Sequence, residues 1–289
     1  MSMTLRVAAC EYPIERLASF QAWRDKLRRL CASAAAHGAT LLVFPEYAAV
    51  ELTALLTQEQ RDDLPGSLRA LQPMRDMFLA AHSELAQELG VTILAGSFPW
   101  AEKGEFYNRA WLCMPDGRTK PQDKIIMTRF EREKWGVLGG PPLEVLDIPG
   151  ARVGVLICYD SEFPFLARRL CEQGAEVLLV PSCTDTEAGF HRVMISCRAR
   201  ALEQQCFVVQ APTAGRAEWS PALDVNTGRA GFFGPVDIGF PDDGILAQGA
   251  PVETAPWLIV DLPLGRLASV RRHGQVTNFR DWEAQAALL

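Results

Sequence analysis

A chain of 289 residues, of which 48% are apolar and 22% charged, has enough apolar material to bury a core and is not a disordered chain. The formal net charge is −6, and Lys and Arg are scattered among acidic residues, so no basic stripe favours nucleic acid or an anionic membrane. We therefore expect small molecules or other proteins as partners.

Apolar runs of strand length alternate along the chain with stretches of helical periodicity, which predicts an α/β layer structure. In chain order, the predicted strands are Leu5–Cys10, Thr40–Phe44, Thr92–Phe98, Asn108–Met114, Arg152–Ile157, Glu176–Val180, Phe207–Ala211 and Trp257–Asp261. The predicted helices are Ile14–His37, Leu68–Leu89, Phe163–Glu172 and His191–Gln205. Periodicity fades where Gly and Pro cluster, at Gly136–Gly150 and from Ala211 to Pro256, and there we expect long loops.

No feature of composition divides the chain, so we expect a single domain over residues 1–289 with a C-terminal tail from about residue 266. Two segments, Ala35–Glu46 and Cys171–Ser182, read alike. In each, a helix ends at a glycine, a short apolar strand follows, and a proline precedes a polar residue. The likeness favours two related halves, although any connection from helix to strand can hold a Gly-Ala pair by chance.

No apolar run approaches the roughly 18–20 residues that a membrane-spanning helix needs. Met1–Arg6 leads directly into the apolar run Val7–Cys10 without the pattern of a secretory signal, so we expect a soluble cytoplasmic protein. The eight cysteines show no paired CxxC spacing. This spacing argues against a disulfide scaffold and against a structural zinc site.

Several predicted strands end at reactive side chains: Glu46, Cys158, and the pair Ser182 and Cys183 each follow an apolar run. Ligands in open α/β sheets gather at the carboxyl ends of strands, so these positions would form a site if they converge. A thiol attacks as the thiolate, which a nearby base or positive charge favours. Burial would raise the pKa of Glu46 and make it a general base.

Each of these residues also has an ordinary interpretation. Cysteines are most often buried core residues, and Glu46 would suit the first turn of a helix over Tyr47–Leu56. An isolated Lys124 would most often lie in solvent, and Glu131 and Glu133 would belong to a charged surface turn. The order of these residues along the chain decides between the two interpretations.

Three segments together resemble the signature segments of the nitrilase, or carbon-nitrogen hydrolase, superfamily. They are Phe44-Pro45-Glu46, then Asp123-Lys124, then Ile157-Cys158-Tyr159-Asp160-Ser161-Glu162-Phe163-Pro164, in the family's order Glu, Lys, Cys. The resemblance spans about residues 5 to 265. The strings Lys124–Gly136 and Trp219–Ala222 are similar to a subgroup sometimes fused to an acetyltransferase domain, and we expect that domain to be absent here.

The resemblance implies a four-layer α-β-β-α sandwich, no metal or organic cofactor, and a homodimer or larger homo-oligomer. It implies an amidase-type enzyme that cleaves a non-peptide C–N bond of a small amide or N-carbamoyl compound through a cysteine thioester, releasing ammonia or an amine. Cys158 would be the nucleophile, Glu46 the general base and Lys124 the group that holds the oxyanion. A second glutamate follows the lysine in this family; Glu131 fits that spacing best, and Glu133 is the alternative.

The predicted substrate-binding residues come from the same neighbourhoods, and the resemblance extends to Tyr107-Asn108 and to Glu176–Ser182. They are Tyr159, Tyr107, Ser182, Cys183 and His191. Side chains from several loops would line the pocket, so the sequence does not identify the substrate.

Three other functions stay open at this point. A Cys-His enzyme would need a histidine beside Cys158, and of the four histidines only His191 is placed to line a pocket. A nitrilase acting on a nitrile is the nearest chemical rival, but such members often carry Trp-Glu after the cysteine, where this chain has Tyr159-Asp160. A catalytically silent binding protein of the same fold would have no reason to retain Glu46, Lys124 and Cys158 together.

Overall fold

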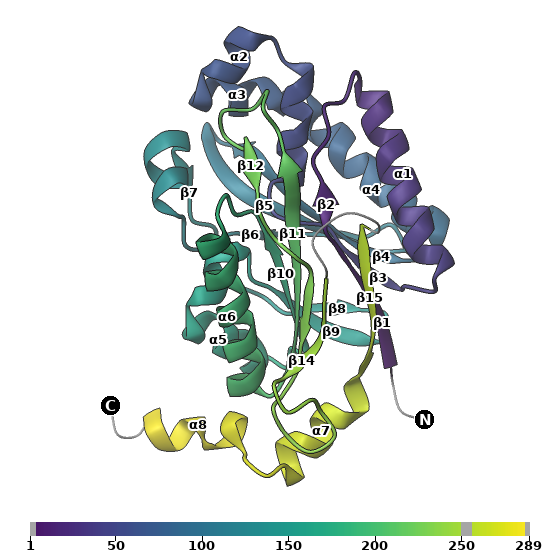
Figure 1. The fold of residues 1–289 in the computed structure, drawn as a ribbon, viewed down its shortest axis with the longest axis vertical. Coiled ribbons are helices and arrows are strands. Elements are labelled where there is room, and N and C mark those ends of the chain that lie inside the picture. Colours follow the sequence, from purple (N-terminus) through teal and green to yellow (C-terminus); the bar gives the residue numbers. More distant parts are fainter. Residues whose placement is uncertain (1–3, 250–255, 287–289) are drawn as a thin grey trace.

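Two β-sheets lie face to face between outer helices in the computed structural model, which describes residues 4–249 and 256–286 (Figure 1). The strands of the first sheet are β1 (Thr4–Cys10), β3 (Leu41–Val43), β4 (Thr92–Glu102), β5 (Glu105–Cys113), β6 (Thr119–Asp123), β7 (Val137–Leu138) and β15 (Trp257–Pro263). Their order is β15-β1-β3-β4-β5-β6, and β7 pairs with β5. β1, β3 and β4 are parallel, so their carboxyl ends lie at one edge of the sheet.

The second sheet repeats this plan with a parallel centre. Its strands are β2 (Tyr12–Pro13), β8 (Leu146–Ile148), β9 (Ala151–Val155), β10 (Val177–Ser182), β11 (Phe207–Arg216), β12 (Val225–Asn226), β13 (Gly231–Phe233) and β14 (Ile245–Gln248). The order is β14-β13-β11-β10-β9-β8, and both β12 and β2 pair with β11. β9, β10 and β11 are parallel, so their carboxyl ends also share an edge.

Helices cover the outer faces of both sheets. The α-helices are α1 (Phe20–Ala36), α2 (Gln58–Asp62), α3 (Leu64–Leu71), α4 (Arg75–Leu89), α5 (Pro164–Glu172), α6 (Glu187–Gln204), α7 (Leu264–His273) and α8 (Asn278–Ala286). Short helical segments are η1 (Ala48–Leu55), η2 (Gln72–Met74), η3 (Glu131–Trp135, a π-turn) and η4 (Cys158–Glu162). Within the described ranges, no helix combines the length and the apolarity that crossing a membrane requires.

Alternation along β1 shows how the layers form. Val7 and Ala9 lie in the core that the two sheets share, whereas Ala8 and Cys10 face the core beneath α1 and α4. Successive side chains of a strand point to opposite faces, so an all-apolar strand is buried by a sheet on one side and by helices on the other. The predicted four-layer α-β-β-α sandwich is thereby confirmed.

The repeated sequence pattern has the same backbone geometry in both sheets. Gly38 after α1 and Gly174 after α5 both adopt left-handed φ angles, of 79° and 98°. The following strands then begin alike: the N–H of Thr40 donates to a carbonyl of β1 and the N–H of Glu176 to a carbonyl of β9, each at 2.9 Å. This agreement supports the interpretation of two related halves.

All eight predicted strands are present, with ends displaced by a few residues, but three predicted helices begin or break differently. The helix predicted from His191 starts at Glu187, after the cap residue Thr186. The helix predicted from Ile14 starts at Phe20, because Ser19 caps it by accepting the N–H of Ala22 at 3.1 Å. The helix predicted over Leu68–Leu89 is interrupted between α3 and α4 by η2, which contains Pro73.

The prediction of long loops in two segments was wrong. The predicted loops at Gly136–Gly150 and Ala211–Pro256 contain β7, β8, the second half of β11, and β12 to β14. Most of these strands have only two to four residues, too few to show a period, and distant partners pair them. The described part of the segment predicted as a tail from about residue 266 contains most of α7, which buries Leu267 and Val270, and α8, and the tail stays a prediction. The single domain over residues 1–289 stays a prediction.

Candidate active site

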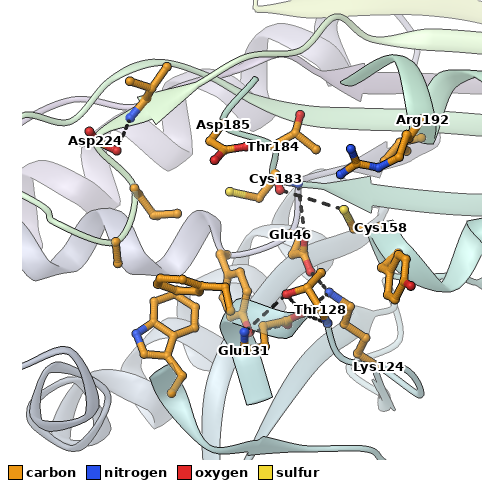
Figure 2. Close-up of a pocket in the computed structure, with 18 of the residues that line it drawn as sticks. Glu46, Lys124, Thr128, Glu131, Cys158, Cys183, Thr184, Asp185, Arg192 and Asp224 are labelled. Carbon is orange, nitrogen blue, oxygen red and sulfur yellow. Dashed lines mark hydrogen bonds and ion pairs between the residues drawn. The ribbon is translucent and has the colours of Figure 1, made fainter. Parts of the chain in front are cut away.

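The carboxyl ends of strands from both sheets meet at one place. Glu46 follows β3 and Lys124 follows β6 in the first sheet, while Cys158 follows β9 and Cys183 follows β10 in the second. Figure 2 shows these four side chains together around one cavity. The convergence expected from the strand ends is therefore present in the structure.

Close backbone packing between β3 and β4 positions Glu46. Gly96 has a φ of +76°, and a Cβ there would lie 2.2 Å from the carbonyl oxygen of Pro45. Only glycine lets β4 approach the chain this closely. On the other side of Glu46, the N–H of Tyr47 donates to Ser97 Oγ at 2.8 Å. Contacts with β4 thus hold the residues on both sides of Glu46.

Cys158 occupies a strained turn at the end of β9. Its φ of 49° is in the left-handed region, which costs a non-glycine residue about 1–3 kcal/mol. Ser161 Oγ stabilises the turn by donating to the Cys158 carbonyl at 2.6 Å. The turn presents the thiol at the strand end in the manner of a nucleophile elbow.

The backbone of Cys183 contacts both the carboxylate and the thiol. Its N–H donates to Glu46 Oε2 at 3.0 Å, and its carbonyl oxygen lies 3.9 Å from Cys158 Sγ as acceptor. One peptide segment of the second sheet therefore holds Glu46 and Cys158 in register with each other.

Asp160 joins the turn of Cys158 to the segment that follows Lys124. Its buried carboxylate accepts the N–H of Ile126 at 2.8 Å and the N–H of Ile125 at 3.1 Å. Burial is the main cause that raises the pKa of Asp160 to about 7, although Lys124 and both amide donors lower it. A single carboxylate thus links the two segments of the site.

Lys124 lies between two carboxylates. Its Nζ is 2.7 Å from Glu46 Oε1 and 2.6 Å from Glu131 Oε2, and all three side chains are at most 3% exposed. Asn108 Nδ2 bridges the same two carboxylates from β5, donating to Oε1 of each at 2.9 Å. These contacts form a buried network with one positive and two negative charges.

Glu131 has the larger set of donors. Besides Lys124 and Asn108, it accepts the Tyr47 hydroxyl at 2.8 Å, the Thr128 N–H at 2.9 Å and the Thr128 hydroxyl at 2.8 Å. Thr128 Oγ1 in turn accepts the N–H of Glu131, so Thr128-x-x-Glu131 forms a capping box. By contrast, Glu133 is half-exposed and pairs with Arg129 at 2.8 Å. Glu131 lies in the network, and Glu133 does not.

The charges of the network shift the pKa values in different directions. Burial is the largest influence on the pKa of each group. It raises the pKa of Glu46, and the negative charge of Glu131 raises this pKa as well. For Glu131, Lys124 and the donors from Thr128 and Asn108 outweigh burial and lower the pKa. The two carboxylates raise the pKa of Lys124 well above its usual value, although burial opposes this. Glu46 is therefore the carboxylate better able to accept a proton.

Burial, followed by the charge of Glu46, raises the pKa of the Cys158 thiol well above its usual value, although Lys124 lowers it. The sequence favoured a thiolate stabilised by a nearby positive charge. In the structure burial and the charge of Glu46 outweigh the charge of Lys124, so the resting thiol is protonated and needs a base. Glu46 faces it.

A cavity of about 330 Å³ opens onto Cys158. Tyr159 and Cys183, two of the predicted substrate-binding residues, line it, and their role in binding stays a prediction. Among the described residues that line it there is no histidine, so no histidine in this part of the chain supports a Cys-His pair. The same described residues include no group of three His, Cys, Asp or Glu side chains placed to hold a metal ion.

Tyr107, Ser182 and His191, also predicted to bind substrate, are not among the residues that line this cavity, and in each case a neighbouring residue faces the site, so their role in binding stays a prediction. Tyr107 precedes Asn108 on β5, and Ser182 precedes Cys183, so alternation directs these two side chains away. His191 is half-exposed on α6 and lies 3.7 Å from Glu187 Oε2, whereas the next two residues of α6 line the cavity.

The sequence interpretation gave no role to Asn108, Asp160 or Thr128. Asn108 and Asp160 stood inside segments that carry the resemblance, but their hydrogen bonds join residues 23 to 62 positions apart and show no local signal. Thr128 did have such a signal, since Ser or Thr three residues before Glu is the pattern of a capping box.

The carbon-nitrogen hydrolase family matches residues 6–272. "Probable hydrolase YhcX" of Bacillus subtilis (strain 168) is 30% identical over 278 residues, which cover 96% of this chain and 53% of that protein. The chain thus spans about half the length of this relative. "Omega-amidase NIT2-B" of Xenopus laevis is 27% identical over 256 residues, with 86% and 85% of the two chains covered. A carbon-nitrogen hydrolase structure from Helicobacter pylori G27 superposes with a TM-score of 0.78 at 19% identity, covering 100% and 99% of the two chains.

Proposed function

The chain belongs to the carbon-nitrogen hydrolase family, which has amidases among its relatives, and we propose that it hydrolyses a small amide or N-carbamoyl compound at Cys158. One observation carries this proposal. The thiol of Cys158, held in a left-handed turn, opens onto a cavity beside the buried Glu46–Lys124 pair. A nucleophile, a base and a cation are thus available to a single carbonyl group of a bound substrate.

In the proposed first half-reaction, Glu46 accepts the thiol proton while Cys158 Sγ attacks the carbonyl carbon of the substrate. The C=O electron pair moves to the oxygen and forms a tetrahedral oxyanion. When the intermediate collapses, the C–N bond breaks, and Glu46 returns the proton to the leaving nitrogen. Ammonia or an amine departs, and an acyl thioester remains on Cys158.

The oxyanion would be held by Lys124 and by the N–H of Tyr159. An ammonium group has three N–H donors, and Glu46 and Glu131 accept two of those of Lys124. The third donor is available for the oxyanion. The first N–H groups of a helical turn have no acceptor within the turn, which leaves the Tyr159 N–H of η4 for the same oxygen.

In the second half-reaction, water attacks the thioester carbon and Glu46 takes a proton from it. The C–S bond breaks, the thiol of Cys158 recovers its proton, and a carboxylic acid leaves. Glu46 suits both steps because its pKa is raised, whereas Glu131 is held as a carboxylate by its donors. In this proposal Glu131 orients Lys124.

A screen of small amides and N-carbamoyl compounds for ammonia release tests the proposal, with the Cys158→Ala variant as control. We expect turnover by the native chain and none by Cys158→Ala. The matching nitriles belong in the same screen, because the thiol and Lys124 would also suit addition to a C≡N bond. Hydrolysis of nitriles alone would make the chain a nitrilase, and turnover by Cys158→Ala would overturn the mechanism.

We further propose that the chain forms a homodimer through the outer layer of α5 and α6. Three large apolar side chains are exposed there: Phe165 (70%), Ile195 (60%) and Leu202 (39%). Ile195 and Leu202 are seven residues apart on α6 and so lie on one face of it, and exposed apolar side chains on a shared face are typical of a protein interface. Sedimentation should show twice the 31.9 kDa mass of the chain, and Ile195→Glu should give the monomer. A monomeric native chain would contradict the proposal.

A further inference from the structure

The residues that line the catalytic cavity are of two chemical kinds. One kind is apolar and includes Phe130, Trp135, Pro221, Ala222 and Leu223. The other kind is charged, and Figure 2 shows Asp185 and Arg192 across the cavity from Lys124 and Glu131. A substrate seated at Cys158 therefore meets both apolar and charged side chains.

The aromatic side chains of the apolar lining, Phe130 and Trp135, are held in place by packing. Phe130 is 39% exposed although it is a large apolar residue, and its ring lies 5.0 Å from the ring of Trp135. Trp135 is buried and packs edge-on against Tyr47, also at 5.0 Å. Phe130 directly precedes Glu131, so the aromatic surface and the catalytic network are fixed to each other. An exposed ring in this place is explained by contact with an apolar ligand.

The charges around the cavity do not balance. Lys124 is shared by Glu46 and Glu131, and Arg192 lies 3.6 Å from Glu162. The lining then includes two further acids, Asp185 and Asp224, for which the described part of the chain provides no ion-pair partner. With five acids and two cations in the lining, the cavity is negative. Such a field attracts cations and opposes a substrate carboxylate.

We propose that the substrate is an amide with an apolar body and with no charge or a positive charge, and that carboxylate-bearing amides are poor substrates. This inference rests on the proposed amide hydrolysis and adds the class of amide to it. Phe130 would select the apolar body, while Asp185 and Asp224 would exclude the anion. Discrimination by repulsion is an ordinary route to specificity.

Four amides with the same four-carbon chain test the inference: butyramide, 4-aminobutyramide, succinamate and 4-phenylbutyramide. They differ at the far end, which is neutral, cationic, anionic and aromatic in turn. At pH 7.5 we expect kcat/KM for butyramide and 4-aminobutyramide to exceed that for succinamate about 10-fold or more, with the gap narrowing as salt screens the charges. We expect 4-phenylbutyramide to be a better substrate than butyramide.

Variants of the acidic and of the apolar lining residues test their separate roles, and a variant outside the cavity is the control. Asp185→Asn and Asp224→Asn should raise kcat/KM for succinamate relative to butyramide and lower it for 4-aminobutyramide relative to butyramide. Asp147→Asn, at an 80% exposed side chain on β8 outside the cavity, should change none of these ratios. Phe130→Ala should lower kcat/KM for 4-phenylbutyramide more than for butyramide.

The outcomes separate the inference from the proposed function. A native chain that hydrolyses butyramide but prefers succinamate would overturn the inference and leave amide hydrolysis standing. If that preference disappeared in Arg192→Gln, Arg192 would instead be the receptor of a substrate carboxylate. If no amide of any charge were hydrolysed, the proposed function and the inference would fail together.

Discussion

Replacing Glu131 with glutamine removes one charge from the network and changes its shape very little. Glu131 has only acceptor oxygens, and it faces donors on both: Lys124 and Thr128 on Oε2, and Asn108 and Tyr47 on Oε1. A glutamine presents an NH₂ group to one of these two sets. In either orientation, at least one donor that faced a carboxylate oxygen then faces another donor.

The expected loss follows from the bonds that change. A hydrogen bond to a charged group contributes about 1.5–3 kcal/mol, so losing one and weakening the bond to Lys124 costs about 3 kcal/mol. If this cost falls on the orientation of Lys124 in the transition state, kcat decreases roughly 100-fold. The charge of Glu131 also helps to raise the pKa of Glu46, so in Glu131→Gln this pKa falls. Glu46 must be ionised to act as a base, and the acid limb of the kcat/KM profile therefore moves to lower pH.

Steady-state ammonia release from pH 5 to pH 9 measures both effects, and a melting curve shows whether the variant is folded. Glu133→Gln is the matched control, because Glu133 lies two residues away in the same π-turn and, among the described side chains, has a hydrogen bond only with Arg129. Native-like kcat in a folded Glu131→Gln variant would refute this reasoning. A large loss in Glu133→Gln would move the role to that residue.

Three further changes give separate expectations. Lys124→Ala removes the oxyanion donor, and ammonia release should show kcat reduced on the order of 100-fold or more. Gly96→Ala places a Cβ 2.2 Å from the Pro45 carbonyl oxygen, so urea unfolding should show a loss of about 1–3 kcal/mol, with reduced activity because Glu46 shifts. Burial raises the pKa of Asp160 from 3.8 to about 7, so the folded state holds a proton that the unfolded chain releases, and stability falls as pH rises through this window. Asp160→Asn should lack that part of the slope in urea unfolding at pH 4 to 8, and an unchanged slope would contradict the assignment.

The strand positions and the order of the reactive residues were predictable from local sequence. The eight predicted strands are apolar runs long enough to show a period, and each was found. Glu46 and Cys158 each follow such a run, so their position at a strand end needed no knowledge of the fold. The helix ends were less predictable, because a cap at Ser19 and a proline at position 73 override the period.

The contents of the pocket were not predictable in the same way. Tyr107 and Asn108 are adjacent in sequence, and only the pairing of β5 with its neighbours decides which of them faces Glu46. The pKa values likewise depend on several distant residues at once. Burial and Glu46 raise the pKa of Cys158, and they outweigh Lys124, which lowers it. Neither result follows from the residues nearest in sequence.

The sequence by itself determined which segments form strands, which reactive residues follow the strand ends, and which family the chain resembles. These properties depend on composition and spacing over a few residues. Only the tertiary structure decided that Asn108 joins two carboxylates, that Asp160 links Cys158 to the segment after Lys124, and that apolar and acidic side chains line one cavity. Those features arise from contacts between distant parts of the chain. Packing decides which side chains of a strand point into the site and which charges are buried.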